Sequence, residues 1–221
     1  DAAVIERLSA AGAILLGKLN MHEFANGPTS VNPHYGPVHN PWDPERISGG
    51  SSGGSAAALA ASFALLTLGT DTGGSIRIPS ALCGCTGLKP TYGRISRYGA
   101  YPLAWSLDHP GPMAKTVKDI ALAMNILAGH DPRDPVTSPA SVPDYVRALS
   151  GDLEGIRVGV PKGFYFERLD PEVRVNVKKA IDALEQLGAN VQGISIPHLQ
   201  EAAIATSVII FAEMAASLEK W

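Results

Sequence analysis

The pattern of apolar and polar positions changes along the chain and is most regular in its C-terminal third. Short apolar runs at residues 156–160 and 190–196 predict two strands. Between them, residues 171–187 have the apolar spacing of an amphipathic helix, with Asp170 at its start and Gly188 after its end. This strand–helix–strand pattern predicts an α/β domain with some parallel sheet.

Apolar segments elsewhere predict further elements. Residues 2–8 have helical spacing, and the run AILLG at residues 13–17 predicts a buried strand. Residues 56–68 are rich in Ala and Leu and almost free of polar side chains, which predicts a helix that is apolar on all sides and therefore buried. Residues 117–127 and 201–221 return to helical spacing.

Composition narrows the class of protein. Of 221 residues, 45% are hydrophobic and 18% charged, which is typical of a globular enzyme. The net charge of −3, without long runs of one sign, argues against a nucleic-acid or anionic-membrane surface. We find no apolar stretch of the roughly 18 residues that a membrane span needs. Cys83 and Cys85 are too close for an unstrained disulfide and predict free thiols in a reducing cytoplasm; the histidines form no metal-binding pattern.

Two loops of small residues flank the apolar run at residues 56–68. The first reads GGSSGGS at residues 49–55, and the second reads TGGS at residues 72–75. Dense glycine marks places where the main chain bends sharply or approaches a ligand closely. Backbone N–H groups in such a loop, at the start of a predicted helix, are free to bind an anion.

Sequence patterns alone leave several interpretations of these loops. The first loop is not a P-loop, because no Gly-Lys-Ser/Thr follows its glycines. Gly49-x-Ser51-x-Gly53 matches a nucleophile elbow by letters, but residues 40–47 lack the apolar strand that an elbow needs. Ser51 or Ser75 could also serve only as a helix cap. The remaining interpretation pairs Ser51 with Ser75 in one catalytic site.

A series of segments supports that pairing. They read GAILLGKLNMHEFA, NPWD, GGSSGGSAAALAAS, LGTDTGGSIRIPS, GLKPTYGR, SLDHPGPM and GHDPRD. In this order and spacing they resemble the amidase signature family, over nearly the whole chain. The resemblance implies an α/β fold with a central mixed β-sheet covered by helices on both faces. We expect a single domain over residues 1–221 that is an incomplete, internal portion of the family fold, truncated at both ends.

The resemblance also implies roles for particular residues. In the family, a Ser–Ser–Lys triad cleaves amides through an acyl-enzyme. Ser75 resembles the nucleophile and Ser51 the bridging serine, which relays a proton between nucleophile and lysine. Chemically, a serine hydroxyl needs such a base, and the tetrahedral oxyanion needs preorganised donors. The oxyanion hole would be formed by N–H groups of Thr72, Gly73 and Gly74, with that of Ser75.

Other positions have smaller expected roles. Ala25 and Asn26 align with a segment that binds substrate in relatives. Asp71 and Arg77 are expected to brace the nucleophile loop through an ion pair or hydrogen bonds. His109 directly follows Asp108 in sequence, which is poor placement for a catalytic relay, so we expect it to be structural.

The catalytic lysine of the family lies in an upstream Gly-x-Pro-x-x-x-Lys-Asp segment, and no such segment occurs here. Lys18 falls in a later family motif that is not catalytic. Lys89 follows the nucleophile, and Lys118 and Lys162 lack the required context. We therefore expect the base to be missing from this chain, and the chain to be inactive alone.

Three functions remain open. The first is a free amidase that releases an amine or ammonia from a small-molecule amide. The second is the glutamine-hydrolysing component, the A subunit, of a tRNA-dependent amidotransferase, which usually reads Asp-Gln-Ile-Gly-Pro where this chain has DHPGP at residues 108–112. The third is a non-catalytic fragment that retains the fold. The departure at residues 108–112 favours the free amidase, for which we expect no cofactor, metal, nucleic-acid or membrane partner, a cytoplasmic location, and a homodimer as one allowed assembly.

Overall fold

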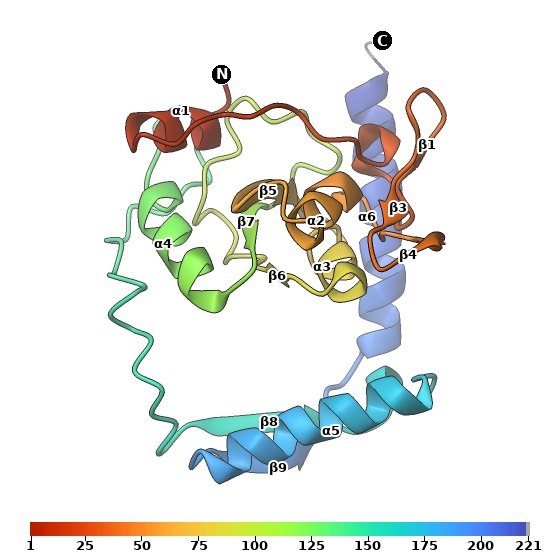
Figure 1. Cartoon of the computed structure of the whole chain (residues 1–221), viewed down its shortest axis with the longest axis vertical. Helices are drawn as coiled ribbons and strands as arrows, with labels where there is room; N and C mark the ends of the chain where they lie inside the picture. Colours follow the sequence, from red (N-terminus) through yellow and green to blue (C-terminus); the bar gives the residue numbers. More distant parts are fainter. Residues whose placement is uncertain (220–221) are drawn as a thin grey trace. The chain divides into compact units, whose positions relative to one another are not determined.

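The computed structural model describes residues 1–219, and the chain forms two compact units (Figure 1). One unit is Asp1–Ala148 together with Val208–Trp221, and the other is Leu149–Ser207. Lys220 and Trp221, at the end of the helix expected over residues 201–221, lie outside the described residues. Both glycine loops belong to the first unit. The expectation of a single domain stays a prediction.

The first unit is built on a three-stranded antiparallel sheet. Its strands are β5 (Leu66–Thr70), β7 (Pro110–Ala114) and β6 (Thr86–Gly87), in the order β5-β7-β6. Every residue of the central strand β7 is buried. Leu66 pairs with Ala114 and Thr70 with Pro110, so β5 and β7 are aligned along their whole length.

Helices cover both faces of this sheet. Helix α4 (Val117–Leu127) packs in one core cluster with Ala114 of β7. Helices α2 (Gly53–Ala60) and α3 (Arg77–Cys83) pack in a second cluster with Met113. Because neighbouring residues of a strand point to opposite faces, the two clusters lie on opposite sides of β7. Figure 1 shows α4 on one side of the sheet and α2 with α3 on the other.

Short elements complete the first unit. They are α1 (Ala3–Ala10), η1 (Glu23–Ala25), β1 (Val31–Asn32), β2 (Gly36–Pro37), β3 (His39–Asn40) and β4 (Asp43–Ile47). Two antiparallel pairs, β1 with β2 and β3 with β4, form hairpins. β4 does precede the first glycine loop, but its residues are mostly exposed, unlike the buried strand of a nucleophile elbow.

The predicted helix over residues 56–68 was wrong in its bounds. The helix covers Gly53–Ala60, and residues 66–70 form strand β5 instead. Ser62 adopts a left-handed conformation with φ 62°, and the N–H of Phe63 donates to the carbonyl of Ala58 while that of Ser62 donates to Leu59. This Schellman arrangement ends the helix. Pairing with β7 then outweighs the helix propensity of the leucines in β5. The predicted burial holds for most of α2.

The predicted buried strand at residues 13–17 was also wrong. These residues have no regular secondary structure, and Ile14 and Leu16 are 85% and 77% exposed. A β-strand needs a neighbouring strand to pair its backbone N–H and C=O groups. Within residues 1–219, no strand pairs with this segment. An apolar run in sequence identifies a segment suited to burial, but it does not supply the partner.

The second unit confirms the strand–helix–strand prediction. Strands β8 (Arg157–Pro161) and β9 (Asn190–Ile194) pair in parallel, with Arg157 opposite Asn190. Helix α5 (Pro171–Gln186) connects them, after the short helix η2 (Phe164–Phe166). The Asp170 carboxylate accepts a 2.8 Å hydrogen bond from the N–H of Glu172 and caps α5 as predicted. Parallel and antiparallel pairing therefore both occur, in separate small sheets, and the α/β class is confirmed.

Helix α6 (Leu199–Leu218) corrects the expectation that no segment could span a membrane. It has 20 residues and a mean hydropathy of 1.5, so it is long and apolar enough by length and composition. Glu201 and Glu213 interrupt the apolar run of this helix in the sequence. The mean hydropathy of the helix nevertheless stays high enough for a membrane span. A core helix of a globular protein meets the same criterion.

Candidate active site

The two glycine loops lie against each other in the first unit. The N–H of Ser52, at the start of α2, donates a 3.1 Å hydrogen bond to the carbonyl of Ser75. Ser75 is half-buried and precedes α3. Since α2 and α3 also share a core cluster, the loops at their N-terminal ends are held together. The structure thus places Ser52, the residue that follows Ser51, in contact with Ser75. The catalytic pairing of Ser51 with Ser75 stays a prediction.

Ser51 is fully buried, and its backbone is held firmly. Its carbonyl accepts 3.0 Å hydrogen bonds from the N–H of His22 and from the hydroxyl of Ser30. The peptide bond between Gly50 and Ser51 is cis. By contrast, the Ser51 hydroxyl has no hydrogen-bond partner within residues 1–219. A buried hydroxyl without a partner is costly, so this atom is placed to receive a hydrogen bond.

The loop at residues 72–75 directs its carbonyls into the protein. The carbonyl of Thr72 accepts from Lys89 Nζ at 3.1 Å, that of Gly74 from the N–H of Ile78 at 2.7 Å, and that of Ser75 from Ser52. Within the described chain, none of the four N–H groups of this loop donates a hydrogen bond. In the described chain, three of the four carbonyls accept hydrogen bonds while the N–H donors remain free, which is the arrangement of an anion-binding loop.

Gly74 explains why this loop needs glycine. Its φ of +138° is unfavourable for a residue with a side chain, and an added Cβ would lie 2.8 Å from Cδ1 of Ile78. At Gly73, an added Cβ would lie 3.4 Å from Cδ1 of Ile210, which is ordinary contact. The tight turn therefore depends on Gly74 more than on Gly73.

A buried carboxylate stabilises the loop at residues 72–75 and the start of α3. Asp71 is fully buried, and its Oδ2 accepts from the N–H groups of Ile76 and Arg77 and from Nε of Arg77. Its Oδ1 contacts Nη2 of Arg77 at 3.0 Å and Nζ of Lys89 at 3.3 Å. Burial alone would raise the pKa of Asp71, but hydrogen bonds from Arg77 and the charges of Arg77 and Lys89 lower it below the usual value. The predicted ion pair of Asp71 with Arg77 is confirmed.

A second carboxylate holds the first residue of the loop. The hydroxyl of Thr72 donates a 2.6 Å hydrogen bond to Oδ1 of Asp108, and the same carboxylate accepts from the N–H groups of Leu103 and Ala104. The neighbouring His109 places Nδ1 2.6 Å from the carbonyl of Leu107, and burial lowers its pKa. Asp108 and His109 therefore bind different partners, as expected for a pair that does not act as a relay.

The proposed substrate-binding residues are only partly brought together. Ala25, in η1, lines a cavity of about 200 Å³ together with Asp108 and Trp105. Asn26, Ser51 and Ser75 do not line it. Phe24 and Ala25 have φ values of 51° and 58°, and such backbone strain in residues other than glycine often accompanies functional sites. The cavity lies beside Asp108, which binds the hydroxyl of Thr72 in the loop at residues 72–75.

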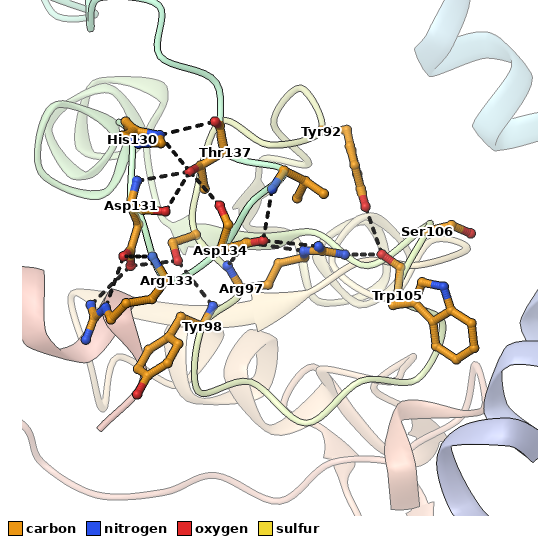
Figure 2. A network of polar contacts seen from close by, with 12 residues as sticks. Tyr92, Arg97, Tyr98, Trp105, Ser106, His130, Asp131, Arg133, Asp134 and Thr137 are labelled. Carbon is orange, nitrogen blue, oxygen red and sulfur yellow. Dashed lines mark hydrogen bonds and ion pairs between the residues drawn. The ribbon is translucent and has the colours of Figure 1, made fainter.

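A polar network forms another wall of this cavity (Figure 2). Arg97 pairs with Asp134 at 3.2 Å and donates through Nη1 to the carbonyl of Trp105. Arg133 pairs with Asp131 at 3.0 Å and lies over the ring of Tyr98, 4.1 Å from its centre. The sequence showed GHDPRD only as a motif. The structure shows that its charged residues anchor the segment leading to Asp108.

Lys89 is a site residue whose position sequence reasoning missed. Its sequence context argues against a role as the base, and nothing in that context points to the carbonyl of Thr72. The other lysines considered, Lys18, Lys118 and Lys162, are exposed. Residues 1–219 contain no group of three His, Cys, Asp or Glu side chains placed to bind a metal ion. Cys83 is buried and Cys85 half-buried, and both are free thiols as predicted.

The chain matches known proteins over its whole length. The family described as Amidase matches residues 1–221. The A subunit of glutamyl-tRNA(Gln) amidotransferase from Chloroflexus aurantiacus is 52% identical over 221 residues, which are 100% of this chain and 45% of that protein. The same protein from Coxiella burnetii is 51% identical over the whole chain and 46% of its own length.

Solved structures show the same fold. The A subunit from Thermotoga maritima superposes with a TM-score of 0.94 at 42% identity, covering 98% of this chain and 48% of that one. Native peptide amidase from Stenotrophomonas maltophilia gives 0.87 at 35% identity, covering 100% and 47%. The chain thus spans about half the length of these relatives. The resemblance inferred from the motifs is confirmed.

Proposed function

Because this chain belongs to the amidase family, we propose that it carries the nucleophile and oxyanion hole of an amide-hydrolysing enzyme, and that the amide is glutamine. The observation that supports the mechanism is the buried hydroxyl of Ser51 beside the Ser75 loop, which has no hydrogen-bond partner among residues 1–219. An atom in that position can pass a proton between Ser75 and a base. The reaction class would be acyl transfer to serine, followed by hydrolysis.

The proposed reaction proceeds in two steps. Ser75 Oγ attacks the amide carbon while its proton passes to Ser51, which gives its own hydroxyl proton to the base, and the N–H groups of residues 72–75 stabilise the oxyanion. The C–N bond breaks, the proton reaches the leaving nitrogen, and ammonia departs from an acyl-enzyme ester. Water then attacks the ester and releases glutamate and free Ser75. Each step conserves atoms and charge without a cofactor.

We propose that a lysine outside these 221 residues is the base. Support comes from the lysines that the chain does contain. Lys89 is engaged with Asp71 and Thr72, and Lys18 is exposed in an irregular segment. The relatives are about twice as long as this chain. This proposal keeps the expectation that the chain is inactive alone.

Glutamine is chosen over other amides because of the relatives. Several A subunits of glutamyl-tRNA(Gln) amidotransferase are 51–52% identical over the whole chain, against 41% for a solved structure described as an amidase and 35% for the peptide amidase. This reverses the preference for a free amidase, which depended on the single segment at residues 108–112. The free amidase remains the second candidate, since His109 in that segment departs from the usual amidotransferase pattern. In the amidotransferase proposal, this chain works together with partner subunits.

The experiment measures ammonia release by the complete protein that contains this chain. Glutamine hydrolysis that depends on co-purified partner proteins and glutamylated tRNA would support the amidotransferase. Hydrolysis of simple amides or peptide amides without partners would support the free amidase instead. If no amide releases ammonia and a fluorophosphonate does not label Ser75, the result would support the third function, a non-catalytic fragment that retains the fold.

A further inference from the structure

Peptide-bond geometry connects the carbonyl contacts of the nucleophile loop with its N–H groups. In a trans peptide the C=O of one residue and the N–H of the next point in opposite directions. Within the described chain, the only cis peptide bond is at Gly50–Ser51, so the bonds of residues 72–75 are trans. A contact that holds the carbonyl of Thr72 therefore also fixes the direction of the Gly73 N–H.

Different groups hold the two carbonyls that precede the Gly73 and Ser75 N–H groups. The Gly74 carbonyl accepts from the N–H of Ile78, a backbone donor in the first turn of α3. The Thr72 carbonyl instead accepts from a side chain, Nζ of Lys89, at 3.1 Å. The Ser75 N–H is thus oriented by the helix, whereas the orientation of the Gly73 N–H depends on one lysine.

Lys89 is itself held in place by charge. Its Nζ lies 3.3 Å from Oδ1 of the fully buried Asp71, and its side chain is 23% exposed. Arg77 and two backbone N–H groups also bind Asp71, so this carboxylate keeps partners without Lys89. Removing the Lys89 ammonium would therefore release the Thr72 carbonyl while leaving the brace between Asp71 and α3.

We propose that Lys89 is a positioning residue that fixes the Gly73 N–H as an oxyanion donor by holding the Thr72 carbonyl. This inference rests on the proposed function and assigns Lys89 a role other than that of the base. Without the ammonium, the Thr72–Gly73 peptide can rotate, and the oxyanion is deprived of a preorganised donor. The effect falls on the transition state, because the charge develops only there.

The test compares three variants of the complete protein. Lys89→Met keeps the length of the side chain and removes the donor, Lys89→Arg restores a charged donor, and Lys118→Met is a matched control at an exposed lysine. For each variant, kcat and KM for glutamine are measured. The affinity for glutamate γ-semialdehyde, which forms a tetrahedral adduct with the serine, is measured alongside thermal stability.

Lys89→Met is expected to lower kcat about 10- to 100-fold at nearly constant KM. Deletion of one oxyanion donor lowers kcat by a factor of about 10²–10³, and a donor that is only misoriented should lower it less. Semialdehyde affinity should fall by a similar factor, Lys89→Arg should recover most of both, and Lys118→Met should match the wild type. A kcat within twofold of the wild type would overturn the proposal. So would a lowered kcat with unchanged semialdehyde affinity.

Two further comparisons keep the result decisive. If Lys89→Met does not fold, Lys89→Arg is compared with Lys89→Leu, which also lacks a donor, and equal kcat values at equal KM would overturn the proposal. A wild-type protein that forms no acyl-enzyme at Ser75 would disprove the proposed function. An active wild type with an unaffected Lys89→Met variant would disprove only the role of Lys89.

Discussion

The N–H of Ser52 donates a 3.1 Å hydrogen bond to the carbonyl of Ser75 and so joins two loops that follow different elements of the chain. This bond couples the buried hydroxyl next to Ser52 to the loop that would carry the nucleophile. Within residues 1–219 the N–H groups of residues 72–75 donate no hydrogen bond, whereas the carbonyls of Thr72, Gly74 and Ser75 accept one each. Each part of this arrangement can be removed separately by substitution.

Ser51→Ala should lower kcat about 10²–10⁴-fold, the usual contribution of a proton-transfer group, without lowering the free energy of unfolding. The second result follows because the hydroxyl has no partner within residues 1–219 to lose. Kinetics and urea denaturation measure the two effects. Ser55→Ala is the matched control, since that buried hydroxyl donates to the carbonyl of Leu68 at 2.8 Å. The Ser55→Ala substitution should lower the free energy of unfolding by about 1 kcal/mol and leave kcat unchanged.

Gly74→Ala should reduce both stability and kcat. The added methyl group would meet Ile78 and force a residue with φ +138° to carry a side chain, at a cost of about 1–3 kcal/mol. Any relaxation of that strain moves the neighbouring N–H groups. Gly17→Ala is the control, because no atom of residues 1–219 lies within 4 Å of its added Cβ. A Gly74→Ala variant with wild-type kcat and melting temperature would show that the turn does not depend on this glycine.

The sequence predicted individual helices and strands better than it predicted which strands pair with each other. The strand–helix–strand segment and α4 were predicted closely, because Asp170, Gly188 and regular apolar spacing mark their ends. The boundary between α2 and β5 was missed, since the same Ala and Leu residues suit either structure until β7 supplies a partner. Similarly, residues 13–17 have a strand pattern but no strand beside them in residues 1–219.

For the site, sequence motifs identified the two serines and the glycines, because close backbone approach demands those residue types. They did not reveal Lys89, whose contact with Thr72 joins residues on either side of α3, nor the bond between Thr72 and Asp108. Contacts between side chains and distant backbone atoms leave no periodic signal. They appear only once the elements are packed.

Acid should destabilise the protein partly through Asp71. Its pKa in the folded state is below the ordinary value of 3.8, so its contribution is fully present above pH 3.8 and is lost as pH falls through the lower folded pKa. Asp71→Asn should be about 3 kcal/mol less stable than the wild type near neutral pH, with a smaller difference below pH 3. Denaturation at several pH values measures this.

The control for acid is Asp152→Asn, at an exposed carboxylate. It should keep the pH dependence of the wild type. The role of Asp71 would be contradicted if its asparagine variant lost stability in acid as steeply as the wild type.

Cys83 should resist alkylation in the folded protein. Burial, with a smaller effect from Cys85, raises the pKa of the Cys83 thiol to about 11. At pH 8 only about one thiol in a thousand is then the reactive thiolate. Iodoacetamide followed by peptide mass spectrometry should show an unmodified Cys83 in native protein and a modified one in concentrated guanidinium chloride. Rapid labelling of native Cys83 would contradict its burial against Ser48, whose carbonyl it contacts at 3.3 Å.

The central claim is that Ser75 is the nucleophile. The most direct measurement treats the complete protein with a fluorophosphonate and maps the modified residue by peptide mass spectrometry. The account predicts one covalent adduct on Ser75, competed by substrate and absent from Ser75→Ala, while Ser62→Ala, at an exposed serine, labels normally. Labelling of another residue, or an active enzyme after Ser75→Ala, would contradict it.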